Sequence, residues 1–382
     1  MEQRPMNVLI VGQLPPPVHG SNVMTELFMQ SMEKIVQKVT IIEKKFSKQQ
    51  EEVGTLTLLK VTKVPGLILK FLWQLIKNKP DVCFYFISVS SFSLVFDALL
   101  IALLRLFGVQ YILYCHGKGF RELELRAGSH MRYVAKFVLT GALGGLVLGE
   151  KLKHDVNHYL PDRRLFILPN AIPNSAPPQK EPGTSRHVQI LYLSNLIPSK
   201  GAMEFVKMAG MVRRAIPDVK FILAGNFRDN IFLRQIHDCI DQEKLRDCMD
   251  IPGAIYGQDK EKLFRKSDLF VFPTYYKYET FGLVNLEAMR SSLPIISTPE
   301  GAIPEVVCDG ITGFIVDPHD IALMSDRVLK LVEDLELRIA MGKAGRRRFE
   351  QYYTIEAYEA KLKEAIQFFS LLLQEKRYTA CE

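Results

Sequence analysis

Short apolar runs alternate with helical segments along nearly the whole chain, and this alternation restricts the fold more than any other feature. The first half contains six such runs, at residues 7–11, 39–42, 82–87, 111–115, 143–149 and 164–170. Five more follow, at residues 187–195, 219–225, 268–274, 294–298 and 313–317, before a helical stretch over 321–374. Short buried strands separated by helices are typical of parallel sheets that are covered on both faces. The sequence therefore predicts an α/β protein.

A proline-rich segment, residues 170–183 (NAIPNSAPPQKEPG), divides the alternation into two parts. It contains almost no large apolar side chain, so we expect it to be an interdomain linker. A chain of 382 residues is long enough for two domains. We therefore expect two doubly wound domains that face a cleft.

The net positive charge of the chain comes from its first half. Residues 1–175 contain 21 Lys and Arg against 13 Asp and Glu, whereas the remainder contains 28 against 29. This asymmetry indicates a polyanionic or membrane-surface partner for the first half, and a merely solvated basic face is the alternative.

None of the six cysteines forms a C-x-x-C pair. This usage predicts reduced, buried thiols in a cytosolic protein.

Two segments of the first half are candidates for contact with a membrane. Val82–Leu104 is long enough to span a bilayer and has Asp97 as its only charge, but serines divide it, so we expect a buried strand and a buried helix. Val53–Lys79 is basic, contains the only Trp (Trp73), and could lie in the headgroup layer. Its lysines are Lys60, Lys63, Lys70, Lys77 and Lys79. We expect Pro65-Gly66 to break it into two short helices, and packing on the sheet is the alternative role of its apolar residues.

Two loops that follow strands are candidate phosphate sites. The loop QLPPPVHG leads into a helix near Ser21, where the N–H groups of Gly20 and Ser21 could meet an anion. Glu43 imitates the acid of a dinucleotide site, but the loop lacks G-x-G-x-x-G, which argues against a dehydrogenase. In the turn SNLIPSKG, Lys200 can hold a phosphate as a point charge.

A third loop carries two carboxylates that flank a helix start. Glu279 ends the loop after an apolar strand, Phe281 and Gly282 are expected to begin the helix, and Glu287 follows about one and a half turns later. Free N–H groups at a helix start suit a diphosphate, and carboxylates suit sugar hydroxyls. Each acid alone is also explained as a helix N-terminal or solvated residue. His154 and His158 are four residues apart on a helix expected over 151–160, but a chance polar face explains them better than a metal site.

Taken together, these motifs resemble the retaining GT-B glycosyltransferases of glycosyltransferase family 4. The matching segments are the loop at 15–21, YCHG (114–117), LPNAI (168–172), SNLIPSKG (194–201), the E-x7-E block (279–287), GAIPE (301–305) and GFIVDP (313–318). The resemblance implies two Rossmann-like domains, an acceptor-side domain over 1–175 and a nucleotide-sugar domain over 176–355. The C-terminal helix, 356–382, is expected to return to the first domain.

The same resemblance implies roles for individual residues on the donor. Gly20 and Ser21 would contact its diphosphate, and Lys200 would neutralise that group. His116 would face the donor sugar as a catalytic residue. Asn195 stands where the family usually has Arg, so one charge on the phosphates is missing.

Further roles fall on the second half of the chain. Glu279 would hold the transferred sugar and phosphate, together with the backbone of Phe281, Gly282 and Leu283. Glu287 would bind the ribose hydroxyls. Backbone near Ala254 and Tyr256 would meet the base.

The resulting expectation is a retaining hexosyl- or N-acetylhexosaminyl-transferase. It would move a sugar from a nucleotide-diphosphate donor, with UDP favoured, to a hydroxyl of a lipid-linked glycan in bacterial surface polysaccharide synthesis. No cofactor is expected, and the absence of Asp-x-Asp predicts that no metal is required. The expected partners are the nucleotide sugar, the glycan acceptor and an anionic membrane surface, but no nucleic acid. The enzyme would be cytoplasmic and peripherally bound to the inner face of the cell membrane. A GT-B-like nucleotide-sugar epimerase and a non-catalytic nucleotide-sugar-binding module remain as alternatives.

Overall fold

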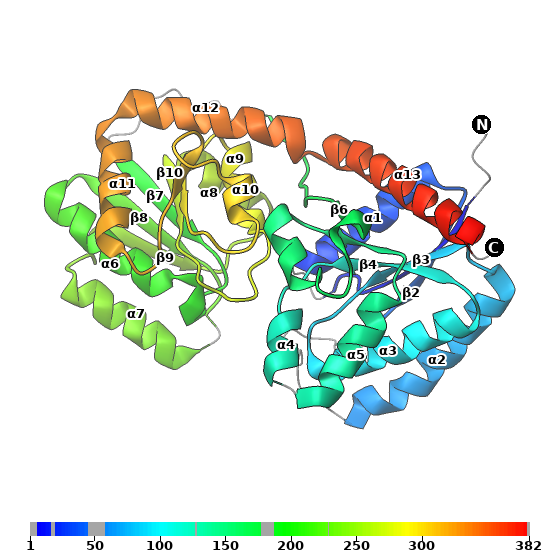
Figure 1. The fold of residues 1–382 in the computed structure, drawn as a ribbon. Coiled ribbons are helices and arrows are strands. Elements are labelled where there is room, and N and C mark those ends of the chain that lie inside the picture. Colours follow the sequence, from blue (N-terminus) through cyan, green and yellow to red (C-terminus); the bar gives the residue numbers. More distant parts are fainter. Residues whose placement is uncertain are drawn as a thin grey trace. The chain divides into compact units, whose positions relative to one another are not determined.

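The chain forms two compact units, each built on a parallel sheet of six strands (Figure 1). The computed structural model describes residues 6–16, 20–44, 58–126, 128–176, 187–227 and 229–379. Unit 1 comprises residues 1–170 and 358–382, and unit 2 comprises residues 171–357. The predicted fold class, two doubly wound α/β sheets with helices on them, is confirmed. Half of the expected linker, residues 177–183, lies outside the described residues.

The sheet of unit 1 has the strand order β2-β1-β3-β4-β5-β6. Its strands are β1 (Asn7–Gly12), β2 (Lys38–Glu43), β3 (Val82–Phe86), β4 (Gln110–Cys115), β5 (Gly144–Val147) and β6 (Leu165–Ile167). Because β2 lies on one side of β1 and β3 on the other, the chain direction across the sheet reverses at β1. In open α/β sheets, ligands bind beyond the carboxyl ends of the strands at such a reversal.

Alternating side chains of β3 explain how helices cover both faces of this sheet. Phe84 packs on Phe28 of α1 and on Phe369 of α13, whereas the Tyr85 hydroxyl donates to Asp97 of α3 on the opposite face. Figure 1 shows α1 and α13 on one side and α2, α3 and α5 on the other. The helices are α1 (Gly20–Ile35), α2 (Leu58–Asn78), α3 (Ser91–Leu106), α4 (Phe120–Arg126), α5 (Gly128–Thr140) and α13 (Ile355–Thr379), with short 3₁₀ turns η2 (Glu150–Asp155) and η3 (Asp162–Arg164).

The predicted break at Pro65-Gly66 is wrong, because α2 continues through both residues. Pro65 and Gly66 are exposed, while Phe71 and Leu75 on the other side of the helix are buried. The proline therefore lies on the solvent side, where a lost backbone hydrogen bond is replaced by water, and the packed side keeps the helix in one piece. Residues 53–57 of the basic segment lie outside the described residues.

The apolar stretch that could have spanned a membrane forms the buried strand β3 and the buried helix α3, as predicted. Its only charge, Asp97, is 1% exposed and pairs with Lys44 Nζ at 2.8 Å. Lys44 Nζ also donates to the carbonyl of Phe86, and the N–H of Ser88 donates to the second carboxylate oxygen of Asp97. Among the described residues, no helix is long and apolar enough to cross a membrane.

The sheet of unit 2 has the strand order β12-β11-β10-β7-β8-β9. Its strands are β7 (Val188–Leu193), β8 (Val219–Ala224), β9 (Met249–Gly253), β10 (Leu269–Phe272), β11 (Ile295–Ser297) and β12 (Gly313–Ile315). The direction of strand addition reverses between the neighbours β7 and β10. This reversal marks the expected ligand position in unit 2.

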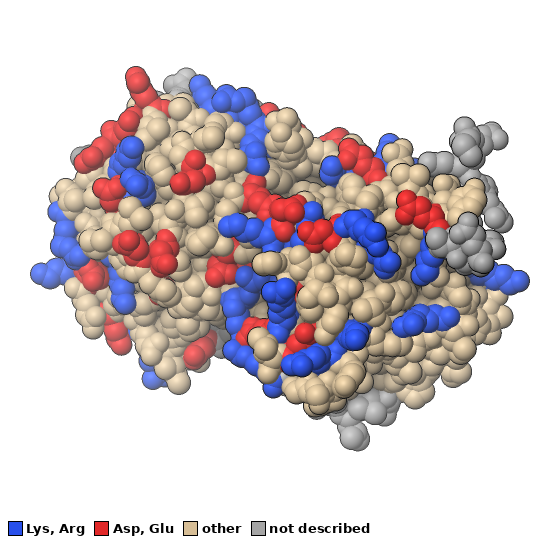
Figure 2. Space-filling model, viewed as in Figure 1, with Lys and Arg blue, Asp and Glu red and all other residues tan. Residues whose placement is uncertain are grey.

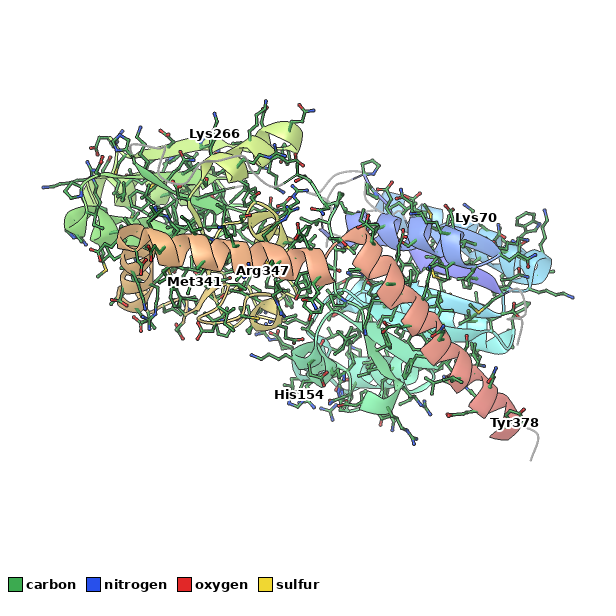
Figure 3. All side chains as sticks on the ribbon, turned by 90° about the horizontal axis from the view of Figure 1, so that it is seen from above. Lys70, His154, Lys266, Met341, Arg347 and Tyr378 are labelled. Carbon is green, nitrogen blue, oxygen red and sulfur yellow. The ribbon has the colours of Figure 1, made fainter. Side chains whose placement is uncertain are left out.

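Helices again pack on both faces of the second sheet. α6 packs on α7 and α11, whereas α9 packs on α8 and α12. The helices are α6 (Ala202–Ala215), α7 (Asn230–Gln242), α8 (Gly257–Lys266), α9 (Leu283–Arg290), α10 (Ile303–Val306), α11 (Ile321–Glu333) and α12 (Leu335–Tyr352), with a 3₁₀ turn η4 (Pro198–Lys200) before α6. Figure 3 shows α12 with Met341 and Arg347 along it.

Candidate functional site

The strand reversal of unit 2 brings Lys200 and Glu279 together. Lys200 ends η4, just after β7, and Glu279 lies in the loop after β10. Lys200 Nζ lies 2.5 Å from Glu279 Oε2, and their side chains are only 15% and 11% exposed. The ammonium also lies 4.6 Å from the ring centre of Tyr276, within the range of a cation–π contact. The two charges, 79 residues apart in sequence, thus meet at the edge of the sheet where a ligand is expected.

The turn that carries Lys200 is shaped by a glycine and a tyrosine. Gly201 has φ 84°, and a Cβ at this position would lie 2.1 Å from the carbonyl oxygen of Pro273. Only glycine therefore lets the two loops approach this closely. The Tyr192 hydroxyl of β7 donates to the carbonyl of Lys200 at 3.0 Å. Burial raises the pKa of Tyr192, which keeps that hydroxyl protonated as a donor.

The helix of the E-x7-E block begins at Leu283, and not at Phe281 or Gly282 as the sequence predicted. Gly282 has φ 68° and ψ 66°, a left-handed conformation outside the helix, and its N–H donates to Glu279 Oε1 at 3.2 Å. Phe281 is 2% exposed and its ring packs against Tyr353. Phe281 is therefore an anchor of the loop, while the backbone of Gly282 and Leu283 forms the start of the helix.

The second carboxylate of the block, Glu287, pairs with Lys260 of α8. Lys260 Nζ lies 2.6 Å from Glu287 Oε1. Glu287 Oε2 is buried and has no hydrogen-bond partner among the described residues. The residues predicted to meet a base, Ala254 and Tyr256, lie in the exposed turn between β9 and α8, and Tyr256 is 72% exposed. Since Tyr256 is the N-cap of α8, this turn and Lys260 belong to one local structure.

Asn195, which replaces the usual Arg of the resembled family, is exposed at the end of β7. Its carbonyl accepts from the N–H of Ile197 at 3.0 Å, so its backbone serves the turn that leads to Lys200. Asn195 brings no positive charge to the turn. Within it, Lys200 is the residue that brings one.

In unit 1, His116 follows β4 and lies among aromatic rings. Its ring stacks on Phe86 at an interplanar angle of 7° and lies 4.1 Å, centre to centre, from Tyr114. Burial lowers the pKa of His116 to about 3, so the imidazole is neutral near pH 7. Its Nε2 is buried and has no partner among the described residues. A neutral imidazole with one unpaired nitrogen can orient a polar ligand by a hydrogen bond, but it cannot offer a positive charge.

Gly20 and Ser21 begin α1 and are exposed, as predicted for the loop after β1. Residues 17–19 of that loop lie outside the described residues. His116, Gly20 and Ser21 belong to unit 1, whereas the other predicted site residues belong to unit 2.

The pair His154 and His158 does not form a metal site. The expected helix through both residues is wrong, since His154 lies in the 3₁₀ turn η2 and His158 lies beyond it. Asp155 of η2 accepts hydrogen bonds from the N–H groups of Gly119 and Phe120, which draws the segment toward α4. His158 Nε2 lies 3.1 Å from Glu124 Oε1. In the described part of the chain, no group of three or more His, Cys, Asp or Glu side chains could hold a metal ion.

Sequence reasoning missed Lys260, Tyr276 and the partner of Asp97. The partners of Lys260 and Tyr276 come from other loops and helices, and nothing in the local sequence indicates such pairs. Asp97 did carry a signal, since a lone charge in an apolar run predicts a buried ion pair. The structure shows that this partner is Lys44, just after the second strand.

Comparisons with known proteins agree with this architecture. Residues 177–348, all in unit 2, match the family model of glycosyl transferases group 1. A GDP-mannose-dependent monoacylated alpha-(1-6)-phosphatidylinositol monomannoside mannosyltransferase of Corynebacterium glutamicum is 28% identical over 179 residues, which is 46% of this chain and 45% of that protein. The capsular polysaccharide biosynthesis glycosyltransferase CapM of Staphylococcus aureus is 26% identical over 166 residues, 43% of this chain and 41% of CapM.

The solved structure of HepE from Anabaena, in complex with UDP, has the same fold. It superposes with a TM-score of 0.73 at 15% identity, covering 95% of this chain and all of HepE. The chain thus shares its fold over nearly its whole length with solved proteins, whereas the match to the curated relatives spans less than half of their length.

Proposed function

We propose that the protein is a retaining glycosyltransferase that uses a nucleoside-diphosphate sugar, with UDP as the favoured nucleotide. The observation that carries the proposal is the Lys200–Glu279 pair at the strand reversal of unit 2, beside the start of α9. The match of this unit to glycosyl transferases group 1 supports it.

The chemistry follows from the charges of this site. The acceptor hydroxyl attacks the anomeric carbon, the bond from that carbon to the β-phosphate oxygen breaks, and the diphosphate leaves with the proton of the acceptor. Lys200 and the free N–H groups at the start of α9 stabilise the charge that develops on the leaving oxygen. Glu279 holds hydroxyls of the transferred sugar. His116, being neutral, positions the sugar through Nε2.

Attack on the same face of the sugar, and hence retention, is part of the proposal and rests on the family resemblance. Proton NMR of the first product formed would give its anomeric configuration. A product with the configuration of the donor supports retention, and an inverted product contradicts it.

Acceptor dependence distinguishes the transferase from its alternatives. First, wild-type protein is screened with UDP- and GDP-sugars, because a donor that binds the native state raises Tm by mass action. Nucleotide release is then measured with and without a glycan acceptor. Release that needs the acceptor supports the transferase, isomerised free sugar nucleotide supports the epimerase, and binding without turnover supports the binding module.

We further propose that transfer needs no metal, because Lys200 and the helix start supply the positive potential. Activity is expected to persist in excess EDTA. Complete loss that Mg²⁺ or Mn²⁺ restores would contradict this part of the proposal.

The proposed acceptor is a lipid-linked glycan of a bacterial surface polysaccharide, met at the inner face of the cell membrane. Two relatives act, by name, on a phosphatidylinositol mannoside and in capsular polysaccharide synthesis. On α2, the exposed side chains of Leu69, Trp73 and Ile76 form one stripe, 67%, 53% and 60% exposed, and Lys77 Nζ lies 4.3 Å from the ring centre of Trp73. A helix of this kind suits the headgroup layer.

Neighbouring helices of unit 1 add to this surface. α3 packs on α2 and exposes Val95, Leu99 and Leu106. Figure 2 shows Lys and Arg gathered over α4 and α5, whose exposed basic residues are Arg121, Arg126, Arg132 and Lys136. Each basic residue near an anionic membrane contributes about 1 kcal/mol, so Lys70, Lys77 and these four residues suffice for weak peripheral binding.

Liposome co-sedimentation tests the membrane proposal. Vesicles with 30% anionic lipid should pellet the wild-type protein at low salt, and K70E/K77E should pellet clearly less. K266E/R347E, which makes the same charge change at exposed sites of unit 2 (Figure 3), should behave like the wild type. Equal sedimentation of all three proteins would contradict a membrane surface on α2.

A further inference from the structure

The ion pair between α8 and α9 leaves one carboxylate oxygen of Glu287 without a partner. Lys260 Nζ holds Oε1 at 2.6 Å, and the side chains of Lys260 and Glu287 are 26% and 16% exposed. Oε2 is buried and accepts no hydrogen bond from the described residues. A buried acceptor that stays unpaired costs about 1–3 kcal/mol. An ionised carboxylate only accepts, so the missing partner must be a donor such as a hydroxyl group.

Lys260 connects this carboxylate to the turn that precedes α8. Its own N–H donates to the carbonyl of Tyr256, so Lys260 lies in the first turn of the helix that Tyr256 caps. Its side chain crosses to α9 and fixes which way the carboxylate of Glu287 faces. One lysine thus ties the turn proposed to meet the base to the acid proposed to meet the ribose.

We propose that Lys260 is a positioning residue that holds Glu287 for recognition of the ribose hydroxyls of the donor nucleotide. The inference rests on the proposed function, since it assumes a ribonucleoside diphosphate at this site. Lys260 acts through Glu287: it occupies Oε1, which leaves Oε2 for a ribose hydroxyl.

A second salt bridge between the same helices provides a control that distinguishes positioning of Glu287 from general support of the contact between α8 and α9. Glu261 Oε1 lies 3.2 Å from Arg290, and Arg290 also donates to the carbonyl of Pro173 at 2.9 Å. This bridge keeps α8 and α9 together when Lys260 is changed. Glu261→Gln weakens the contact between the helices without touching Glu287 and is therefore the matched control.

The test compares binding of UDP with that of 2′-deoxy-UDP and 3′-deoxy-UDP by titration calorimetry. The guanine compounds replace them if GDP alone raises the wild-type Tm. The wild type should prefer the ribonucleotide over at least one deoxy analogue by about 10-fold or more, since a lost hydroxyl leaves Oε2 unpaired. K260M should reduce that preference to about 3-fold or less by weakening ribonucleotide binding alone, as should E287Q. E261Q should keep the full preference.

The results that overturn the inference are distinct from those that overturn the proposed function. If the wild type binds no nucleoside diphosphate at all, the proposed function fails and the role of Lys260 with it. If it binds UDP or GDP but shows no preference for the ribose, or if K260M keeps the preference, Lys260 has no such role. Equal loss of preference in K260M and E261Q would mean that Lys260 only supports the helix contact.

Discussion

The loops at the carboxyl ends of the two sheets differ in charge and polarity. In unit 2, the loops after β7 and β10 present the charged pair Lys200–Glu279, and a second pair, Lys260–Glu287, lies on α8 and α9. In unit 1, His116 after β4 is neutral and lies among the rings of Phe86 and Tyr114. In the buried ion pair of unit 1, Lys44–Asp97, both side chains also form hydrogen bonds with other groups of the protein.

This difference indicates different roles for the charged pairs of the two units, although the units have similar folds. The two charged pairs of unit 2 lie where we propose that the donor nucleotide binds, and one carboxylate oxygen, Glu287 Oε2, has no hydrogen-bond partner among the described residues. The buried pair of unit 1 has a structural role, since Lys44 and Asp97 connect the end of β2 with the end of β3 and with α3. We therefore expect changes to the Lys44–Asp97 pair to alter stability, and changes to the Lys200–Glu279 and Lys260–Glu287 pairs to alter ligand binding and turnover.

The largest expected effect is on stability, from Lys44→Met. This change leaves Asp97 as an unpaired charge, 1% exposed, and should lower the free energy of unfolding by about 3–5 kcal/mol in urea titrations. The protein that remains folded should bind UDP or GDP as the wild type does. In K44M/D97N, the amide oxygen can accept from the N–H of Ser88 while the amide nitrogen donates to the Tyr85 hydroxyl, so at least half of the lost stability should return. A single variant as stable as the wild type would contradict the structural role of this pair.

The next effect is on turnover, from Glu279→Gln. The amide keeps the acceptor for the N–H of Gly282 but removes the charge that pairs with Lys200. We expect kcat to fall at least about 100-fold, or roughly 2.7 kcal/mol of transition-state stabilisation. The same fall is expected for Lys200→Met. Full activity of Glu279→Gln would end the assignment of this pair to the reaction.

A smaller effect concerns acid stability and His116. Burial lowers the pKa of His116 from 6.5 to about 3 in the folded protein. Between these two values, the unfolded chain binds a proton at this histidine and the folded chain does not. Stability is therefore lost as the pH falls from 6.5 toward 3. Between pH 7.5 and pH 5, the wild type should lose about 1–2 kcal/mol more than His116→Asn, which cannot titrate. Parallel stability curves for the two proteins would show that His116 is not held neutral by burial.

Much of this contrast could be predicted from the sequence, because sequence motifs identify the charged residues in the loops after the strands. The alternation of apolar runs predicted both sheets but missed the edge strand β9. Lys200, Glu279 and Glu287 stood out because each follows a buried strand or opens a helix. The neutral state of His116 could not be predicted, since it depends on rings from β3 and β4 that only the fold brings around it. The same holds for Lys260, whose partner lies on another helix.

Errors of prediction arose where tertiary packing decides local structure. Pro65-Gly66 predicts a helix break by backbone propensity, but the buried side of α2 keeps the helix continuous. The segment 151–160 has a helical pattern, yet Asp155 caps the N–H groups of Gly119 and Phe120, and only the turn η2 forms.

The central claim is that unit 2 recognises the nucleotide and that the aromatic site of unit 1 does not. Calorimetric titration of UDP and GDP into Glu287→Gln and His116→Asn tests it most directly, since neither nucleotide carries the sugar that His116 is proposed to face. For the nucleotide that the wild type binds, Glu287→Gln should weaken binding by about 10-fold or more, because a neutral amide replaces a charged acceptor. His116→Asn should stay close to the wild type. Loss of binding in His116→Asn with normal binding in Glu287→Gln would contradict the account.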